Sequence, residues 1–413
     1  MQNKKIVVVG AGPAGLMAAI RAAKLSQEVT LIDKNPSLGK KLLLSGKGRC
    51  NLTNASGLEA FLKRFSRNGE FLRDAFKKFF NQDLINFFQE RGLATKVERQ
   101  LRVFPVTDSS SSIVKVLESE LSKQGVKVIY NTKVRELLVE GGRVKGLRLE
   151  TEELLLCDKL ILATGGVSYS FTGSTGEGLD MARRAGHNIV PLRPGLVPLV
   201  TREKYPNILE GLALKNIRLK FCAGRSEILS EVGELIFTGF GISGPLVLTL
   251  SAKVADWLNN KKEVSVQIDL KPGLTEEMLS ARFLREFKMN AKKGIKNIMK
   301  EVLPIKLIDL FMELAKINPH KKANQVTQIE REALVTLLKG WRLNIASVRP
   351  LEEGMITQGG VSLKDINPRT MESRLIKGLY FCGEMIDLDA DTGGFNLQAA
   401  FSTGYLAGES AAL

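Results

Sequence analysis

The feature that most constrains the fold is the pattern G-x-G-x-x-G over Gly10–Gly15, close to the N-terminus. It follows the apolar run Lys5–Val9, which is typical of a buried parallel strand, and it opens a helical stretch, Ala14–Leu25. A second strand is expected over Glu28–Asp33. This order predicts the first β-α-β unit of a doubly wound α/β sheet.

Each residue of the glycine turn has a physical role in binding a dinucleotide. Gly10 permits a tight turn, Gly12 lets the backbone approach a pyrophosphate, and Gly15 lets the helix pack closely on the sheet. Pro13 fits the first helical position, where its missing N–H has no partner to lose. The carboxylate of Asp33 can accept hydrogen bonds from an adenosine ribose and would repel a 2′-phosphate.

The composition is that of a soluble globular protein. The 413 residues allow two or three domains, at roughly 100–200 residues per domain. The chain contains no run of about 18 apolar residues, and glycines interrupt its N-terminal apolar stretch. We therefore expect a cytoplasmic protein that is neither exported nor membrane-bound.

The cysteines and histidines argue against a metal site. Four cysteines lie far apart without a C-x-x-C pair, and there are two histidines, His187 and His320. This pattern disfavours a zinc site, a multi-histidine site and a dithiol centre of adjacent cysteines. We expect no metal and a reducing cellular compartment.

The chain is strongly basic, with 60 Lys and Arg against 44 Asp and Glu, a formal net charge of +16. Such an excess favours anionic partners such as a phosphorylated cofactor, an acidic metabolite or nucleic acid. Residues 282–300 are especially basic and suggest RNA. This segment lacks interleaved aromatic residues, so widely spread charge on an ordinary enzyme is the favoured interpretation.

The texture of the sequence changes twice along the chain. Alternating apolar residues over 191–272 predict antiparallel strands, and residues 273–341 become helical and basic. After Trp341 the strand-and-glycine texture returns, and a last helix is expected over Phe395–Ala412. We expect a Rossmann-like nucleotide-binding domain of residues 1–190 and 342–413, with a β-rich insertion (191–272) and a helical insertion (273–341).

Three further motifs carry chemistry. Leu44–Asn54, LSGKGRCNLTN, is a glycine-rich basic loop suited to phosphate or flavin carbonyls. Its Cys50 is the thiol expected nearest a flavin, although a packing role is the commoner one for such a residue. Ala163–Gly166 ends a buried strand in small residues, which brings backbone close to a ligand at the carboxyl edge of the sheet.

The last motif spans Gly378–Gly394 and continues into the final helix. Glu384 follows a strand, where its carboxylate could accept a hydrogen bond from a ribityl hydroxyl. Gly393 and Gly394 would present backbone amides at the helix N-terminus, where they stabilise an anionic reduced flavin. The two halves of the chain together indicate FAD in preference to free NAD.

These motifs resemble the HI0933-like flavoprotein family, also described as NAD(P)/FAD-dependent oxidoreductases or aminoacetone oxidase-like enzymes. The resemblance covers essentially the whole chain. Its most diagnostic pieces are GKKLLLSGKGRCNLTN, ATGGVSYSFTGSTGEG, GELIFTGFGISGP and GLYFCGEMIDLDADTGGFNLQ. It implies a glutathione-reductase-like FAD domain interrupted by a barrel-like β insertion and a small helical insertion.

The resemblance also implies a set of FAD contacts and shows two departures from the family pattern. Gly239 stands where relatives often carry histidine, and Ser170 stands where proline commonly follows the Ser-Tyr pair. A proton-donating imidazole at position 239 is therefore absent. The implied FAD contacts are Gly10, Gly12, Pro13, Ala14, Gly15, Asp33, Lys34, Lys40, Gly46, Arg49, Cys50, Asn51, Val134, Thr164, Gly165, Gly383, Glu384, Gly394, Asn396, Leu397 and Gln398.

The leading functional hypothesis is an FAD-dependent oxidoreductase that transfers hydride between a small-molecule substrate and flavin N5. One complete dinucleotide fingerprint is present, so either NAD(P)H docks transiently as donor or electrons pass from substrate to oxygen. Two alternatives are a flavoprotein that acts on or binds RNA and a flavin-binding protein without turnover. The sequence identifies no catalytic acid or base, no substrate and no oligomeric state.

Overall fold

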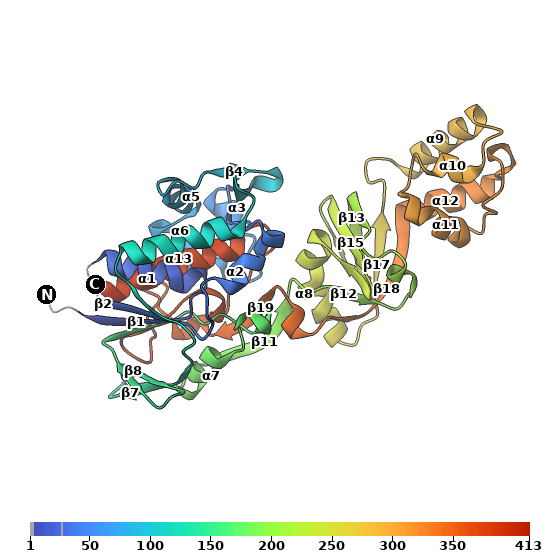
Figure 1. The fold of residues 1–413 in the computed structure, drawn as a ribbon. Coiled ribbons are helices and arrows are strands. Elements are labelled where there is room, and N and C mark those ends of the chain that lie inside the picture. Colours follow the sequence, from blue (N-terminus) through green and yellow to red (C-terminus); the bar gives the residue numbers. More distant parts are fainter. Residues whose placement is uncertain (1–3, 26–27) are drawn as a thin grey trace. The chain divides into compact units, whose positions relative to one another are not determined.

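The computed structural model describes residues 4–25 and 28–413 (Figure 1). It divides into two compact units: unit 1 comprises Met1–Gly195 and Leu351–Leu413, and unit 2 comprises Leu196–Pro350. Both boundaries differ by several residues from those expected. Strand β11 (Ile189–Gly195) pairs with β19 (Ile356–Val361) inside unit 1, and β18 (Trp341–Val348) pairs with strands of unit 2.

Unit 1 is built on a parallel five-stranded sheet in the order β20-β10-β1-β2-β6. The glycine-turn strand β1 is buried at four of its five positions and lies between β2 and β10. This topology confirms the expected α/β fold class. The strands are β1 (Lys5–Val9), β2 (Glu28–Ile32), β6 (Lys127–Ile129), β10 (Lys159–Leu162) and β20 (Leu379–Phe381).

The first and last helices of unit 1 pack against each other. A Cβ on Gly404 would lie 2.1 Å from the Ala14 carbonyl oxygen, and one on Gly408 would lie 2.3 Å from that of Ala18. Such close packing joins α13 (Phe395–Ala412) to α1 (Pro13–Lys24). Figure 1 shows both helices, with α6 (Ser110–Lys123), over one face of the sheet.

The remaining elements of unit 1 surround this core. Phe76, Phe79 and Phe88 are buried, as expected for core-facing positions, and the hairpin turn expected at Gly141-Gly142 joins β7 to β8. The elements are α2 (Lys40–Leu44), β3 (Thr53–Asn54), α3 (Leu58–Leu62), α4 (Arg73–Lys78), α5 (Asn81–Gln89), β4 (Thr95–Val97), β5 (Arg102–Pro105), β7 (Val134–Glu140), β8 (Arg143–Leu149), β9 (Leu154–Leu156) and α7 (Glu177–Arg184).

Unit 2 contains an antiparallel sheet in the order β14-β13-β15-β16-β12-β18-β17. It closes into a barrel because β13 also pairs with β17. The alternating burial of β13 places Leu219 and Phe221 inside, as its sequence alternation predicts. The elements are β12 (Leu199–Thr201), β13 (Ala213–Ala223), β14 (Ser226–Leu229), β15 (Gly233–Thr238), β16 (Gly241–Ser243), α8 (Pro245–Asn259), β17 (Val264–Asp269) and β18.

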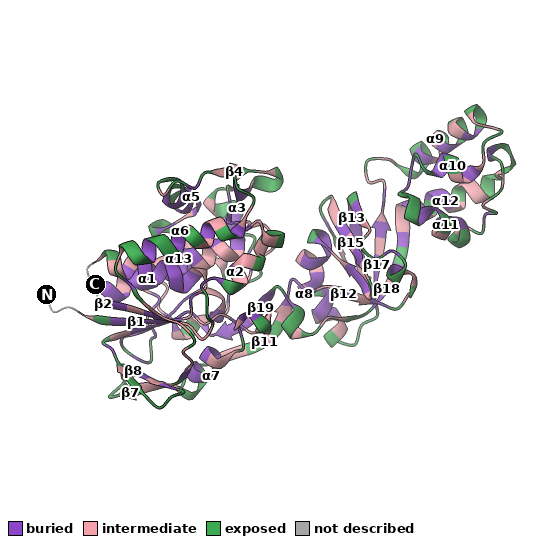
Figure 2. Ribbon diagram, viewed as in Figure 1, coloured by how far each residue is buried: buried purple, intermediate pink, exposed green. Residues whose placement is uncertain are grey.

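A helical segment is inserted between β17 and β18 of this barrel. It comprises α9 (Glu276–Met289), α10 (Ile295–Met299), α11 (Ile305–Leu314) and α12 (Gln328–Gly340). Thr327 and Glu330 form a capping box at the start of α12, and Pro304 precedes α11. Figure 2 shows the alternation of buried and exposed positions along these helices. Among the described residues, no helix is long and apolar enough to cross a membrane.

Candidate functional site

The glycine turn leaves one open position above the N-terminus of α1. A Cβ on Gly10 would lie 2.5 Å from the Ala163 carbonyl oxygen, and one on Gly15 would lie 1.8 Å from the Gly10 carbonyl oxygen. A Cβ on Gly12 would meet no atom within 4 Å. No side chain caps α1, so its first amides face this open space, where the helix dipole favours an anion.

Asp33 is held beside this turn by backbone donors. Its Oδ2 accepts a hydrogen bond from Ala11 N at 2.6 Å, and its Oδ1 accepts one from Asn35 N at 2.7 Å. Because Oδ1 also accepts from Asn35 Nδ2 at 3.0 Å, the remaining acceptor is Oδ2, which can accept a further hydrogen bond from a donor such as a ribose hydroxyl. Nearby, the Lys34 ammonium donates to Thr175 and to Glu177, and that of Lys40 lies 3.5 Å from the Asn35 side-chain oxygen.

The loop after α2 contains a buried thiol. Cys50 is fully buried with a positive φ of 60°. Burial raises its pKa to about 12, so the thiol is neutral near pH 7. Since the thiolate is the reactive form, this environment favours a packing role for Cys50.

Arg49, in the same loop, is engaged by carboxylates. Its Nε donates to Asp108 at 2.8 Å, and its terminal nitrogens pair with Glu98 and Asp108. The guanidinium also lies over the Phe104 ring, 4.2 Å from its centroid. These partners take up donors that were expected to meet an anionic ligand.

Asn51 carries an acceptor that the chain itself does not satisfy. Its Oδ1 is shielded from solvent and has no hydrogen-bond partner among the described residues. An unsatisfied buried polar atom typically costs about 1–3 kcal/mol. A hydrogen-bond donor from a bound ligand would remove that penalty. The backbone of Gly46 also lies close to this residue, since a Cβ on Gly46 would lie 2.8 Å from the Asn51 backbone nitrogen.

The carboxylate of Glu384 joins four separate segments of unit 1. Its Oε1 accepts hydrogen bonds from Ser168 Oγ at 2.7 Å and from Thr357 N at 2.8 Å. Its Oε2 accepts one from Lys41 Nζ at 2.5 Å, and Lys41 also donates to Ser168 Oγ at 2.7 Å. This polar cluster is half-buried next to the carboxyl ends of β10 and β20.

Ser168 and Thr357 were not predicted as site residues, and of the adjacent pair Lys40-Lys41 only Lys40 was expected as an FAD contact. The signals were available in the sequence, since Lys41 follows Lys40 in the GKK triplet and Ser168 lies in the GGVSYS motif. Their proximity to Glu384 depends on tertiary pairing and is not visible from spacing. For Thr357 the sequence offers no such signal, because its neighbours in the chain do not distinguish it from other strand residues.

Other predicted residues support the loops around this edge. Thr164 Oγ1 contacts the Met385 sulfur at 3.8 Å, and a Cβ on Gly165 would lie 3.1 Å from Ser174 Oγ. Gly383 N donates to Thr403 Oγ1 at 3.0 Å. These contacts lie where β10 and β20 end, at the carboxyl edge of the sheet.

The residues at the start of α13 are largely occupied by protein contacts. Gln398 is fully buried and bonds Thr53 and Ser402, and Asn396 bonds both backbone groups of Ala390. Leu397 is partly buried against the core of unit 1. Gly394 precedes the helix, with its Cα against the Thr53 backbone.

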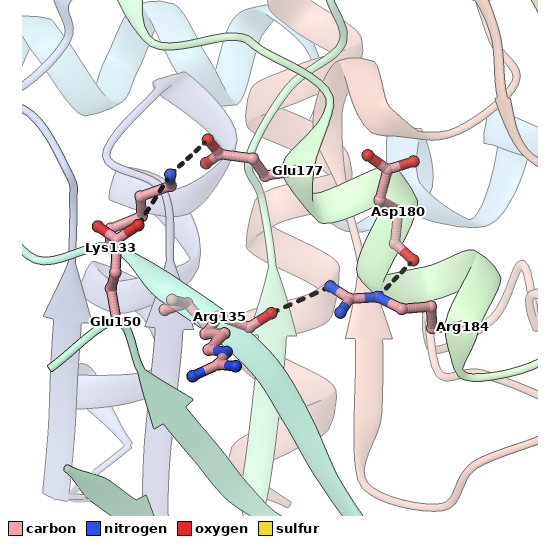
Figure 3. Close-up of a pocket in the computed structure, with 7 residues that line it drawn as sticks. Lys133, Arg135, Glu150, Glu177, Asp180 and Arg184 are labelled. Carbon is pink, nitrogen blue, oxygen red and sulfur yellow. Dashed lines mark hydrogen bonds and ion pairs between the residues drawn. The ribbon is translucent and has the colours of Figure 1, made fainter. Parts of the chain in front are cut away.

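A pocket of about 370 Å³ opens beside Val134, one of the implied FAD contacts (Figure 3). Lys133 Nζ lies 3.2 Å from Glu150 and 3.4 Å from Glu177 across this pocket. Glu177 also pairs with Lys34, which connects the pocket to the region of Asp33. Its lining comprises Lys133, Val134, Arg135, Glu150, Glu177, Asp180 and Arg184.

In unit 2, a carboxylate occupies the space beside Gly239. A Cβ at this exposed position would lie 3.2 Å from Glu210 Oε2 and 3.6 Å from Asn207 Oδ1. The adjacent Thr238 hydroxyl is buried and without a hydrogen-bond partner among the described residues. The sequence did not indicate Glu210, because only the barrel brings residues 207–210 next to 239.

Comparison with known proteins gives the same fold and one consistent family. Residues 4–410 match the family described as HI0933-like protein Rossmann domain. In solved structures, 3-ketosteroid-Δ4-(5α)-dehydrogenase from Rhodococcus jostii aligns with a TM-score of 0.56 and 15% identity, covering 100% of this chain and 98% of that one. At that identity the likeness concerns the fold alone.

Two curated relatives are similar over nearly their full lengths. The 3-dehydro-bile acid Δ(4,6)-reductase of Clostridium scindens is 32% identical over 99% of both chains. The ribosomal RNA dihydrouridine synthase of Haemophilus influenzae is also 32% identical, over 98% of this chain and 97% of its own.

Proposed function

The chain belongs to the HI0933-like family of Rossmann-domain flavoproteins, and we propose that it reduces a carbon–carbon double bond conjugated to a carbonyl group. It is an FAD-dependent oxidoreductase of this family. The proposed reaction rests on one observation: the names of two equally similar relatives point to different substrate molecules that contain the same type of reducible double bond. A 3-oxo-Δ4,6 steroid and a uracil ring both carry an alkene conjugated to a carbonyl.

We assign the binding of FAD to the residues whose geometry fits it. The open space above Gly12 suits the pyrophosphate, Asp33 suits the ribose, and the pocket beside Val134 suits the adenine. The free acceptor of Asn51 and the Glu384–Lys41 pair suit the flavin end. When bound, FAD supplies the hydride of the reaction.

The reduction also places a proton on the second carbon of the double bond, and this proton can come from solvent. Within unit 2, the exposed carboxylate of Glu210 lies beside Gly239, where the family pattern often has an imidazole.

For the substrate we favour a uracil base within RNA over a steroid. The support is the net charge of +16, which attracts a polyanion and gives no advantage toward a largely apolar steroid. Relatives with either substrate are equally similar, so the charge is the deciding observation.

The test is a reoxidation assay under anaerobic conditions. The flavin of the holoprotein is reduced with NADH or NADPH, and then unmodified ribosomal RNA or a 3-oxo-4-ene steroid is added. Rapid reoxidation by RNA, with dihydrouridine found in the product by mass spectrometry, supports the proposal. If only the steroid reoxidises the flavin, the substrate is a small α,β-unsaturated ketone and not RNA. If neither compound reoxidises it, the proposed reduction of a conjugated double bond is refuted.

A further inference from the structure

We propose that five cations at one end of the helical segment of unit 2 form a docking surface for the phosphate backbone of RNA. This basic tip comprises Arg285, Lys288, Lys292, Lys293 and Lys322. The inference rests on the proposed action on RNA and adds the place where the polyanion binds.

Backbone pairing brings the cations together from two distant parts of the sequence. Ala323 N donates to the Lys293 carbonyl oxygen at 2.9 Å, and Ile295 N donates to that of Lys321 at 2.9 Å. Gly294 and Lys322 form an antiparallel bridge between these two loops. Lys292 and Lys293 therefore lie alongside Lys322, just beyond the C-terminal end of α9.

The five cations are exposed and take part in no ion pair among the residues that the structure describes. Three other lysines of the helical segment are paired: Lys296 with Asp309, Lys321 with Glu330, and Lys339 with Asp269. The nearby carboxylate Glu286 is directed to Asn290. Three lysines of the helical segment are thus used in salt bridges, whereas the described residues place no carboxylate in an ion pair with any member of the basic tip.

Helix stability explains only a small part of this cluster. Lys288 lies in the last turn of α9, where a cation gains about 0.3–1 kcal/mol from the helix dipole. Lys292, Lys293 and Lys322 lie outside any α-helix, so this reason does not apply to them. A concentration of like charge without a structural role favours a polyanionic ligand.

The chemistry of the basic tip suits backbone docking. Four of its five members are lysines, which contact phosphate as point charges and lack the bidentate fork that reads a guanine edge. The tip contains no aromatic side chain for stacking on bases. We therefore expect it to hold structured RNA by its phosphates and to add affinity without sequence preference.

The experiment compares two triple variants of the full-length holoprotein. K292Q/K293Q/K322Q removes three charges from the basic tip, and K63Q/K115Q/K123Q removes three from unit 1. The control lysines are exposed and likewise form no ion pair among the described residues. Binding to purified ribosomal RNA is measured by filter retention over a series of salt concentrations.

For the tip variant we expect binding at least about tenfold weaker, and a salt slope of log K smaller by about 2 to 3, because three phosphate contacts are lost. The control should change little in either quantity. An equal loss in both variants, no loss in the tip variant, or tighter binding of wild type to anionic phospholipid vesicles than to RNA would overturn the docking surface.

Two further readouts separate this inference from the proposed function. NADH- or NADPH-dependent flavin reduction should be unchanged in both variants, which excludes a general folding defect. If the wild type binds RNA through the tip but forms no dihydrouridine, the docking surface stands and the proposed reaction fails. If dihydrouridine forms equally well with the tip variant and its RNA affinity is unchanged, the docking surface fails alone.

Discussion

A pair of glycine substitutions in one turn should separate cofactor binding from folding. Gly12→Ala adds a methyl group to a position with no atom within 4 Å, whereas Gly15→Ala drives one to 1.8 Å from the Gly10 carbonyl oxygen. The first therefore blocks only the space assigned to the pyrophosphate. The second forces the protein itself to move.

For Gly12→Ala the effects on the apoprotein nearly cancel. Gly12 has φ −80° and ψ 179°, which alanine adopts without strain. Loss of a preferred N-cap residue lowers the free energy of unfolding by about 0.5–1 kcal/mol. The alanine also restricts the unfolded chain, which raises the free energy of unfolding by about 0.4–1 kcal/mol. FAD affinity should fall by about tenfold to about a hundredfold, because one charge-assisted hydrogen bond to the pyrophosphate, worth about 1.5–3 kcal/mol, is lost.

For Gly15→Ala the folded state itself is destabilised. Overpacking typically lowers the free energy of unfolding by about 1–3 kcal/mol. Because the added methyl group would meet a backbone carbonyl, which cannot move aside easily, we expect a loss near the upper end of this range. A net loss of about 2 kcal/mol lowers the Tm by roughly 4–8 °C in a domain of this size.

The assays are thermal unfolding of deflavinated protein and FAD titration followed by quenching of flavin fluorescence. Wild-type affinity in Gly12→Ala would contradict the assignment of the open space to pyrophosphate. A loss of apoprotein stability in Gly12→Ala as large as that in Gly15→Ala would refute the distinction between the two glycines.

Two further outcomes are expected. Cys50→Ser should retain full turnover and lose some stability, because burial keeps the thiol protonated; an inactive but folded variant would contradict the packing role. Burial lowers the pKa of His187 below its usual value near 6.5, so the unfolded chain binds the extra proton first and the free energy of unfolding should decrease as pH falls below that value. Urea denaturation between about pH 5 and 7.5 checks this; His187→Gln should abolish that dependence and His320→Gln should preserve it.

Much of unit 1 could be predicted because its signals are local. The strand Lys5–Val9, the glycine turn and the helix α13 were each expected within one residue or at the same bounds. Hydrophobic period, turn residues and helix caps act between neighbours in the chain, so a single sequence carries them. The family match over residues 4–410 agrees with that prediction.

The exact extent of each unit could not be predicted. Strand β18 has the texture of the nucleotide-binding part, yet it completes the barrel by pairing with β12 and β17. Strand β11 begins where the β-rich texture starts, yet it pairs with β19 of unit 1. Alternation specifies that a strand has two faces and leaves its partner undetermined.

The polar cluster around Glu384 shows the same limit at the level of the site. The sequence alone determined the residue types at the edge of the sheet: glycines, a carboxylate and lysines near a dinucleotide turn. Only tertiary structure decided that Lys41, Ser168 and Thr357 meet that carboxylate, that Arg49 is held by Glu98 and Asp108, and that Glu210 lies beside Gly239. The physical reason is that hydrogen bonds and ion pairs depend on distance in space, which separations of up to 343 residues along the chain do not encode.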